Sequence, residues 1–241
     1  MDDFLIKPRR EGRDPLLNDY GLLLVNPAEA VAAQKKAVKQ GWLRHFLFNS
    51  QLYTDPDGIG FWAGPAVGAP MAVMALEKLI ALGARKILVY GWCGAIMPGV
   101  HIGELVMPTW CLSEEGTSAH YRRRAVTPET SAGLADRWAA EFIKAGFACR
   151  RGPVWTTDAP YMETKAKVRQ CQEQGILGVD MELAALCTVA AVRGIELAAV
   201  FLVSDELWHD QWKSGFSSKA FKAESRALLE FVFDNCRVMA G

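Results

Sequence analysis

The run Lys86-Ile87-Leu88-Val89-Tyr90, followed directly by Gly91-Trp92-Cys93-Gly94, decides the fold class of this chain. A short, continuous apolar run bounded by glycine is typical of a strand that is buried on both faces. The two glycines after it allow a backbone to approach a ligand closely. We therefore predict an internal strand of a sheet, with a ligand-facing loop at its end.

Similar apolar runs alternate with segments of helical spacing in both directions from this strand. The predicted strands are residues 21–25, 104–108, 152–157 and 197–203, and the predicted helices are residues 28–40, 70–82, 132–146 and 178–193. Such alternation predicts an α/β fold, a three-layer sandwich with a mostly parallel, twisted sheet flanked by helices. Without an internal repeat or a linker, residues 1–241 are expected to form one domain, with residues 1–19 as an N-terminal extension.

The composition narrows the class of protein. Of the 241 residues, 51% are hydrophobic and 22% charged, and 27 basic residues balance 27 acidic ones. Zero net charge argues against nucleic acid or a membrane surface as the main partner, and the run Arg122-Arg123-Arg124 is typical of a solvated edge. No apolar stretch approaches the roughly 18 residues of a membrane span, and no signal peptide is visible. Six scattered cysteines without a CxxC pair predict reduced thiols and a cytoplasmic protein.

Three predicted strand exits are candidate ligand sites, because ligands of open α/β sheets bind beyond the carboxyl ends of strands. They are Asn26-Pro27, residues 91–94 and Ser204-Asp205. Asp205 follows an apolar run, where a carboxylate needs solvent, hydrogen bonds or a proton, although it could simply cap a turn. Glu182 lies among apolar residues, so it needs donors such as sugar hydroxyls, an arginine or a backbone cap.

Other classes of site are not supported by the sequence. There is neither a GxGxxG fingerprint nor a Walker-type GK[ST] motif, which argues against a dinucleotide-binding or nucleotide triphosphate-hydrolysing protein. The four histidines, His45, His101, His120 and His209, lack metal-ligand spacing. We therefore expect no metal and no cofactor.

Six segments together resemble the nucleoside phosphorylase and nucleosidase family, which contains purine nucleoside phosphorylases, uridine phosphorylases and methylthioadenosine nucleosidases. They are GVDMELAAL (178–186), VSD (203–205), GWCGA (91–95), GPAVG (64–68), GTSAHY (116–121) and TTDAPY (156–161), in the family's order. The resemblance runs from about Gly21 to the last helix. It implies cleavage of the bond between ribose C1′ and the base nitrogen through an oxocarbenium-like transition state.

The resemblance also implies roles for single residues. Met181 would pack beneath the sugar, Glu182 would accept hydrogen bonds from its 2′- and 3′-hydroxyls, and His120 would reach its 5′ end. Asp205 would be the general acid that protonates N7 of a purine-type base, which requires a raised pKa.

The base site would be completed by Ser204, Asp158 and Tyr161. The pyrimidine-cleaving branch lacks the aspartate at position 205, so the resemblance favours a purine-type nucleoside. Pro160 stands where the family has a stacking phenylalanine, which leaves the identity of the base open.

This chain departs from the family in the residues that would bind the attacking phosphate. Two phosphate-binding arginines align with Glu29 and Val89, and a hydroxyl residue aligns with Trp92, so Val89, Gly91, Trp92, Cys93 and Gly94 form a degenerate phosphate loop. An acid about 4 Å from phosphate would cost about 4 kcal/mol per charge pair at a surface-like dielectric. Nucleosidases use a glutamate in the first loop to activate water. We therefore favour hydrolysis with Glu29 as the general base, although Glu29 could equally be a glutamate on a first helical turn.

Two alternatives remain open at this point. The first is phosphorolysis with a rearranged phosphate site, in which Arg44, Arg9, Arg10 or Arg13 supplies the positive charge, within one subunit or from a neighbour. The second is a non-catalytic nucleoside-binding protein. The family assembles as dimers or hexamers, so the resemblance implies a homodimer or homohexamer whose partners are a nucleoside and either water or phosphate.

Overall fold

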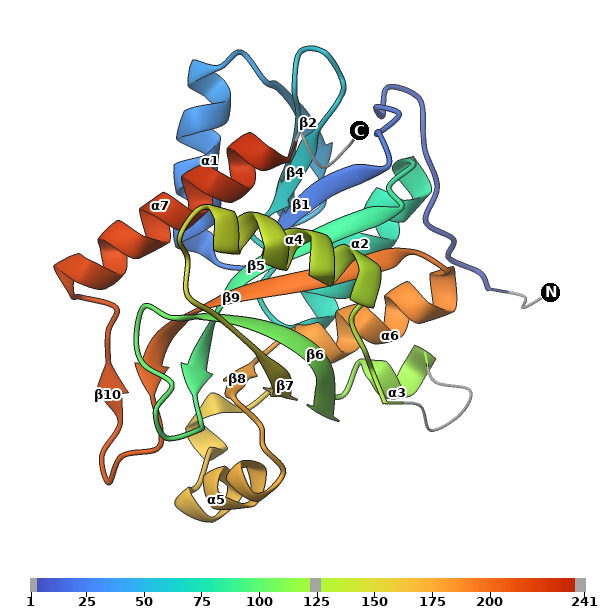
Figure 1. Ribbon diagram of the computed structural model, residues 1–241. Helices are drawn as coiled ribbons and strands as arrows, with labels where there is room; N and C mark the ends of the chain where they lie inside the picture. Colours follow the sequence, from blue (N-terminus) through green and yellow to red (C-terminus); the bar gives the residue numbers. More distant parts are fainter. Residues whose placement is uncertain (1–3, 122–126, 237–241) are drawn as a thin grey trace.

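The computed structural model describes residues 4–121 and 127–236, so the arginine run at 122–124 lies outside the described residues. Ten strands form one sheet: β1 (Tyr20–Leu24), β2 (Leu43–Leu47), β3 (Ser50–Thr54), β4 (Phe61–Gly64), β5 (Lys86–Ala95), β6 (Leu105–Glu114), β7 (Cys149–Thr157), β8 (Gly178–Asp180), β9 (Glu196–Glu206) and β10 (Lys213–Ser214). The helices are α1 (Pro27–Lys39), α2 (Ala69–Leu82), α3 (Ser118–Tyr121), α4 (Ala132–Lys144), α5 (Lys165–Glu173), α6 (Leu183–Arg193) and α7 (Lys219–Asn235), with one 3-10 turn, η1 (Pro160–Met162). The expected α/β fold is confirmed (Figure 1).

The sheet is partly closed on itself. Its strand order is β10-β9-β6-β7-β8-β5-β1-β4-β3-β2, and β9 also pairs with β5. The strands β5, β8, β7, β6 and β9 therefore form a ring, while β1 to β4 extend it as an open sheet. The longest pairings, β5–β9 and β6–β7, are parallel, whereas the β2–β3–β4 edge and the short β5–β8 pairing are antiparallel.

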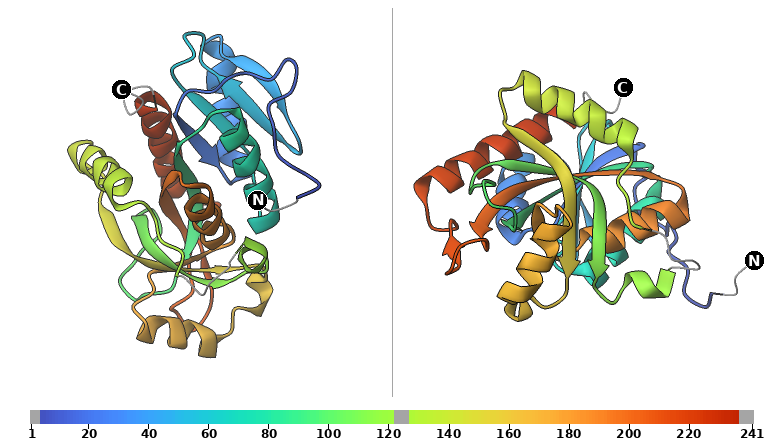
Figure 2. Two further views of the ribbon diagram at one scale, coloured as in Figure 1. Left: turned by 90° about the vertical axis from the view of Figure 1, so that its right-hand side faces the viewer. Right: turned by 60° about the horizontal axis from the view of Figure 1, so that its bottom comes forward.

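The central strands are buried on both faces because their residues alternate between two hydrophobic clusters. In β5, Ile87 and Val89 belong to one cluster and Leu88 and Tyr90 to the other. The first cluster includes α2 and α6, and the second includes α1, α4 and α7. These two sets of helices cover opposite faces of the sheet (Figure 2), which gives the three layers.

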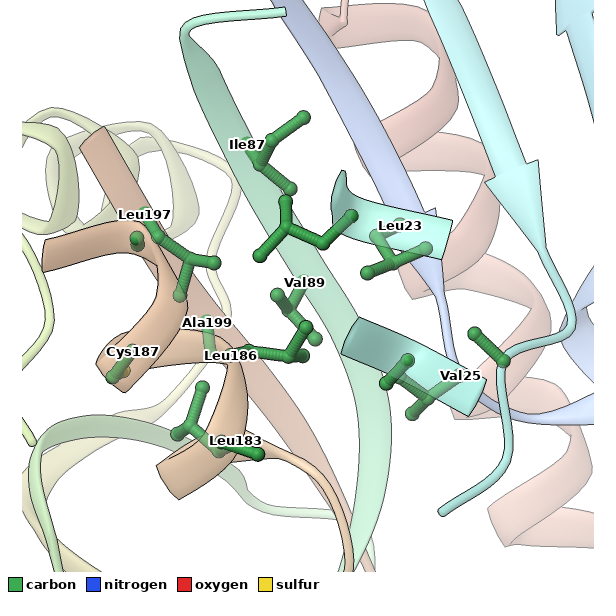
Figure 3. Close-up of a cluster of buried hydrophobic side chains, with 14 of the residues drawn as sticks. Leu23, Val25, Ile87, Val89, Leu183, Leu186, Cys187, Leu197 and Ala199 are labelled. Carbon is green, nitrogen blue, oxygen red and sulfur yellow. The ribbon is translucent and has the colours of Figure 1, made fainter. Parts of the chain in front are cut away.

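Figure 3 shows how closely one of these faces is packed. Val89 of β5 lies next to Leu186 of α6, and Ile87 of β5 and Leu183 of α6 belong to the same cluster. The side chain of Val89 is fully buried. The position that aligns with a phosphate-binding arginine is therefore part of the apolar core and faces no ligand.

Two predicted element boundaries were wrong for the same reason. We expected residues 91–94 to form a loop, but β5 continues to Ala95, and β9 continues past Ser204 to Glu206. The two strands pair along their whole length, with a register shift between Cys93 and Gly94. Backbone pairing with a neighbour thus overrides the tendency of glycine to end a strand.

The segment 178–193 also differs from the predicted helix. Gly178–Asp180 forms β8, which pairs with Gly94 and Ala95 of β5 on one side and with β7 on the other. Helix α6 begins only at Leu183, with Glu182 as its N-cap residue. In the N-terminal extension, Leu17 is buried and its N–H donates to Leu82 O, so that part of the extension packs against the end of α2.

No described helix combines the length and the apolar character needed to cross a membrane.

Gly91 provides a test of the close packing between β1, β5 and β9. A Cβ at this position would lie 2.4 Å from Val25 Cγ2 and 3.1 Å from Phe201 Cε1. We expect Gly91→Ala to lower the free energy of unfolding by about 1–3 kcal/mol, because an overpacked core must shift. Denaturant unfolding measures the change.

Gly133→Ala in α4 is the matched control. A Cβ there has no neighbour within 4 Å, so this variant should be neutral or up to about 1 kcal/mol more stable, as alanine is the better helix former. Equal stabilities for the two variants would contradict the proposed packing around Gly91.

Candidate active site

A cavity of about 690 Å³ lies where β1, β5 and β9 end and α6 begins. Its walls come from residues 25–27 after β1, residues 92–94 of β5, residues 179–182 of β8 and the α6 N-cap, residues 204–216 from the end of β9 onward, and residues 160–168 of η1 and α5. This is the position expected for a ligand site of an α/β sheet. The size suits a nucleoside-sized molecule.

The cavity brings together most of the residues singled out in the sequence. Those that line it are Trp92, Cys93, Gly94, Tyr161, Met181, Glu182, Ser204 and Asp205. Those that do not line it are Glu29, Val89, Gly91, His120 and Asp158. His120 and Asp158 are both exposed, and Asp158 accepts a hydrogen bond from Gly116 N–H at 2.9 Å. Their proposed contacts with the sugar and the base therefore have no support in this geometry.

Asp205 is held firmly at the edge of the cavity. Ser204 Oγ donates to its Oδ1 at 2.6 Å, and Trp212 Nε1 donates to its Oδ2 at 2.7 Å. Glycine at position 94 leaves room for the carboxyl group of Asp205, because a Cβ at Gly94 would lie 3.0 Å from Asp205 Oδ2. In this arrangement the carboxylate acts as an acceptor on both oxygens. Ser204 thus orients Asp205, which explains its place in the site better than contact with a base.

Glu182 joins the beginnings of two helices. It is the N-cap residue of α6, and its Oε1 accepts a hydrogen bond at 2.6 Å from the N–H of Gly68, the N-cap residue of α2. The partner of the carboxylate is therefore a backbone cap, one of the alternatives left open by the sequence. Helix N-termini carry partial positive charge and favour a carboxylate between them. Glu182 also lines the cavity beside Met181, where it can face a ligand.

Asp180 binds the backbone at the start of α6 and so helps to hold Glu182 in position. Its Oδ2 accepts hydrogen bonds from the N–H groups of Glu182 and Leu183 at 2.8 and 2.6 Å, and its Oδ1 accepts one from Thr156 Oγ1 at 2.6 Å. These are the N–H groups that a helix start leaves without intrahelical partners. Asp180 thereby fixes the direction in which α6 begins, and with it the position of Glu182.

Burial gives several acids in and beside the cavity a raised pKa. Burial raises the pKa of Glu182, and the nearby charge of Asp180 raises it further. Burial also raises the pKa of Asp180, against hydrogen bonds from Thr156 and the α6 backbone that lower it. Glu163 has a pKa of about 7, because it is largely buried and lies near the charge of Asp205.

Glu29 does not occupy the place expected of a general base. Its side chain is 2% exposed, and its Oε1 accepts hydrogen bonds from Trp92 Nε1 at 3.0 Å and Ser225 Oγ at 2.5 Å. Burial raises its pKa, and these two donors lower it only in part. Glu29 thus lies behind Trp92, between the sheet and α7, outside the cavity wall. The prediction that it activates water at the sugar has no geometric support.

The cavity is acidic and contains no arginine among its described wall residues. Its carboxylates are Glu163, Asp180, Glu182, Asp205 and Asp210, against one lysine, Lys165, and one histidine, His209. Arg44 lies elsewhere, in a separate surface cleft of about 610 Å³ formed by the β2–β3 hairpin and Pro65. In the N-terminal segment, Arg9 binds Glu11 and Arg10 binds Asp14 O, while Arg13 is exposed and also lies outside the cavity wall.

Sequence reasoning missed several residues of the cavity wall, among them Glu163, Lys165 and Trp212. They come from the η1–α5 region and from the connection between β9 and β10, where no apolar pattern marks a strand end. Trp212 follows the strand exit at Asp205 by seven positions, and this closeness was the available signal. Across the described part of the chain, no group of three or more metal-ligating side chains is arranged to hold a metal ion.

The raised pKa values make stability depend on pH in a defined direction. A carboxyl with a raised pKa binds more protons in the folded than in the unfolded state, so its contribution to stability is present at low pH and is lost as pH rises through the folded pKa. For Glu163 the window lies between about pH 4.5 and 7. Glu29, Asp180 and Glu182 act in the same direction, and the lowered pKa of His45 opposes them below pH 6.5.

We therefore expect the free energy of unfolding to be higher at pH 5.5 than at pH 8 by about 1–3 kcal/mol, since one pKa unit is worth about 1.4 kcal/mol. Denaturant unfolding at constant ionic strength measures it. Glu163→Gln should reduce the slope, because it removes one of the titrating groups. Stability that rises with pH across this range would contradict the assignment.

Comparison with known proteins identifies the family of the chain. The family model of the phosphorylase superfamily matches residues 52–232. Guanosine phosphorylase of Halorubrum lacusprofundi is 29% identical over 166 residues, 68% of each chain. The DeoD-type purine nucleoside phosphorylase of Bacillus cereus is 27% identical over 147 residues, 60% of this chain and 63% of the relative, so that match spans less than two thirds of the relative.

Two solved structures share the fold. A purine nucleoside phosphorylase from Toxoplasma gondii superposes with a TM-score of 0.82 at 15% identity, covering 100% of this chain and 98% of the other. A uridine phosphorylase from Vibrio fischeri superposes with a TM-score of 0.71 at 20% identity, covering 93% and 90%. The family model covers more than half of the chain, and the chain therefore belongs to the phosphorylase superfamily, as its motifs predicted.

Proposed function

We propose that this enzyme cleaves the N-ribosidic bond of a purine-type nucleoside and transfers the ribosyl group to phosphate. The observation that carries the proposal is the cavity shared by Met181 and Glu182, at the start of α6, and Asp205, near the end of β9, which would serve as a sugar-binding carboxylate and an acid at the base. The matched relatives are named guanosine phosphorylase and purine nucleoside phosphorylase, which favours phosphorolysis over hydrolysis.

The sugar end of the cavity suits a transition state in which positive charge builds on the ribose. Glu182 accepts a hydrogen bond from Gly68 N–H through Oε1 and lines the cavity, so ribose hydroxyls can bind to the same carboxylate. In its ionised form, Glu182 together with the other acids of the wall would stabilise the cationic sugar electrostatically. Fixing Glu182 between two helix starts means that it needs little reorganisation during the reaction.

The base end combines an acid with aromatic side chains. Asp205 is bound by Trp212, whose ring is itself largely exposed, and Phe216 lines the same wall. Tyr161 is fully exposed at the rim, so a stacking role would require it to turn inward over a bound base. Flat apolar rings beside a carboxylate suit a planar base whose nitrogen gains a proton as it leaves.

The phosphate end is incomplete within one chain. Trp92 occupies the wall where the family has a hydroxyl residue, and Lys165 and His209 are the only basic side chains of the described walls. A neighbouring subunit that contributes Arg44 would supply the missing charge, as the family's assemblies imply. This assembly, as a homodimer or homohexamer, remains part of the proposal.

The scarcity of positive charge in the cavity wall favours a second candidate function, hydrolysis. Water is neutral, so it needs no cationic site, whereas phosphate is repelled by an acidic wall. Hydrolysis therefore remains the rival reaction, although the general base cannot be Glu29 as the side chain is placed.

Phosphate dependence of base release distinguishes the two reactions. We expect guanosine, inosine or adenosine to release its base only when phosphate is present, with ribose 1-phosphate as the second product, measured by chromatography. Equal release in phosphate-free buffer would establish hydrolysis instead. Nucleoside binding without release under either condition would indicate a binding protein.

Glu182→Gln tests the sugar end. The amide oxygen can still accept the hydrogen bond from Gly68, but the negative charge is lost. We expect kcat/KM for ribonucleosides to fall by about 10²–10³-fold, the loss typical of one preorganised electrostatic contact.

Asp136→Asn is the control for the Glu182→Gln variant, because Asp136 is exposed on α4 and binds only Arg151 among the described residues. It should leave kcat/KM unchanged. An unaltered rate in Glu182→Gln, with both variants folded by unfolding midpoint, would remove Glu182 from the proposed mechanism.

A further inference from the structure

The hydrogen bond from Trp212 to Asp205 occupies an oxygen that a bound base would have to reach. Asp205 Oδ1 accepts a hydrogen bond from Ser204 Oγ at 2.6 Å, and Oδ2 accepts one from Trp212 Nε1 at 2.7 Å. Ser204 is buried within β9, directly before Asp205, whereas Trp212 is 63% exposed. Of the two donors, Trp212 is therefore the one that a ligand in the cavity can replace.

The chemistry of the indole group makes this contact incompatible with acid catalysis. An indole N–H can donate a hydrogen bond but cannot accept one. While Trp212 binds Oδ2, this oxygen acts as an acceptor and cannot present a proton to the cavity. In the proposed reaction Asp205 would give a proton to the base nitrogen. Trp212 and the base therefore compete for the same oxygen.

Trp212 belongs to a short segment whose two ends are fixed to the sheet. At one end, Leu207 N–H donates to Ala95 O at 2.8 Å, and at the other, Lys213–Ser214 pairs with β9 as β10 (Figure 1). Residues 210–212, between these two ends, are exposed. The indole can therefore leave the carboxyl group by a turn of its side chain, without movement of the strands on either side.

The other contact that ties residues 210–212 to the cavity rim is weak. Asp210 Oδ1 lies 3.8 Å from Lys165 Nζ, at the start of α5. Both side chains are largely exposed, and an ion pair of this kind contributes little to stability. The hydrogen bond of Trp212 is therefore the main obstacle to opening this side of the cavity.

An aromatic row continues from Trp212 into the cavity wall. The ring centroids of Trp212 and Phe216 are 6.3 Å apart, and those of Phe216 and Trp92 are 5.7 Å apart. All three side chains line the cavity. Aromatic rings at such separations attract one another and favour a further flat ring beside them. The indole thus has a place in the wall, beside a planar base, that does not depend on its bond to Asp205.

We propose that Trp212 selects the base: its N–H closes Asp205 Oδ2 until a ring nitrogen of the base takes its place. This inference deepens the proposed function and rests on it. A base with such a nitrogen replaces the hydrogen bond that Asp205 loses, whereas a base without one leaves the carboxyl group without this partner. Trp212 is thus a specificity-determining residue, and its N–H weakens the binding of the bases that displace it.

Trp212→Phe tests this competition, because phenylalanine keeps an aromatic ring but has no N–H. Hypoxanthine and 7-deazahypoxanthine are matched probes that differ at N7, and neither has a ribosyl bond to cleave. We expect the variant to bind hypoxanthine about 3–10-fold more tightly than the native enzyme, the effect of one hydrogen bond. Binding of 7-deazahypoxanthine should change by less than about twofold. Titration calorimetry in phosphate-free buffer measures both dissociation constants.

Trp110→Phe is the matched control, because Trp110 lies on β6 outside the cavity wall, and both affinities should stay at their native values. Unchanged or weaker binding of hypoxanthine to Trp212→Phe would overturn the proposal. An equal gain for the two bases would also overturn it, since the indole would then obstruct the cavity by its bulk alone. Unfolding midpoints equal to that of the native enzyme establish that both variants are folded.

The indole N–H signals of the native enzyme give a second measurement that needs no turnover. In nitrogen-15 NMR of labelled tryptophan, the signal of Trp212 is the one that is missing from Trp212→Phe. We expect saturating hypoxanthine to shift this signal as the bond to Asp205 breaks, and 7-deazahypoxanthine to move it far less.

This measurement separates the inference from the proposed function. A signal that stays in place with hypoxanthine, or a native enzyme that binds neither base, would overturn the role of Trp212 even if nucleosides are cleaved. The expected shift in an enzyme that releases no base from any nucleoside would instead reject the proposed function.

Discussion

The parallel pairing of β5 with β9 is the constraint on which the rest of the site depends. It runs from Lys86 opposite Glu196 to Ala95 opposite Glu206, with a register shift between Cys93 and Gly94. The shift places Asp205, and not Ser204, opposite Gly94. This irregularity brings Asp205 beside Gly94 at the cavity, which Ser204 also lines. Ser204 Oγ lies within hydrogen-bond distance of both Asp205 Oδ1 and Cys93 O.

The sugar end is attached to the same strand. Gly94 and Ala95 also pair with β8, whose last residue, Asp180, binds the first N–H groups of α6 and so positions Glu182. Gly94 and Ala95 of β5 therefore pair with the strands that carry both ends of the candidate site. This common support explains why Gly94 tolerates no side chain: a Cβ would contact Leu207, Asp205 and Val179 together.

The sequence predicts those features that depend on local pattern. Residues buried on both faces of β5 and β9 produce unbroken apolar runs, and the family motif around Met181 and Glu182 marks the sugar site. Long-range pairing has no local signature, so the extension of β5 through its glycines, the short strand β8 and the closure of the ring were not predicted. Glu163 was missed because it reaches the cavity wall that it shares with Asp205 only in the folded chain, 42 positions away in sequence.

Glu29 shows that a local signal can be present and still be overlooked. The buried residues of α1 are Glu29, Ala30, Ala33 and Ala37, a stripe with helical spacing. Glu29 and Ala33 are four positions apart, so they share the face that packs toward α7, and the spacing alone places Glu29 inside the protein. Trp92 and Ser225 donate to Oε1 of its buried carboxyl, while Oε2 is buried without a hydrogen-bond partner among the described residues. Glu29 and Trp92 are thus one structural unit, at two positions where the sequence resemblance predicts phosphate ligands in the family. Because this unit turns its polar atoms away from the cavity, the wall in front of it offers an indole face and no charge. In the proposed reaction, positive charge for a phosphate would accordingly have to come from beyond this part of the chain, and the acids of the cavity wall would stabilise the cationic sugar.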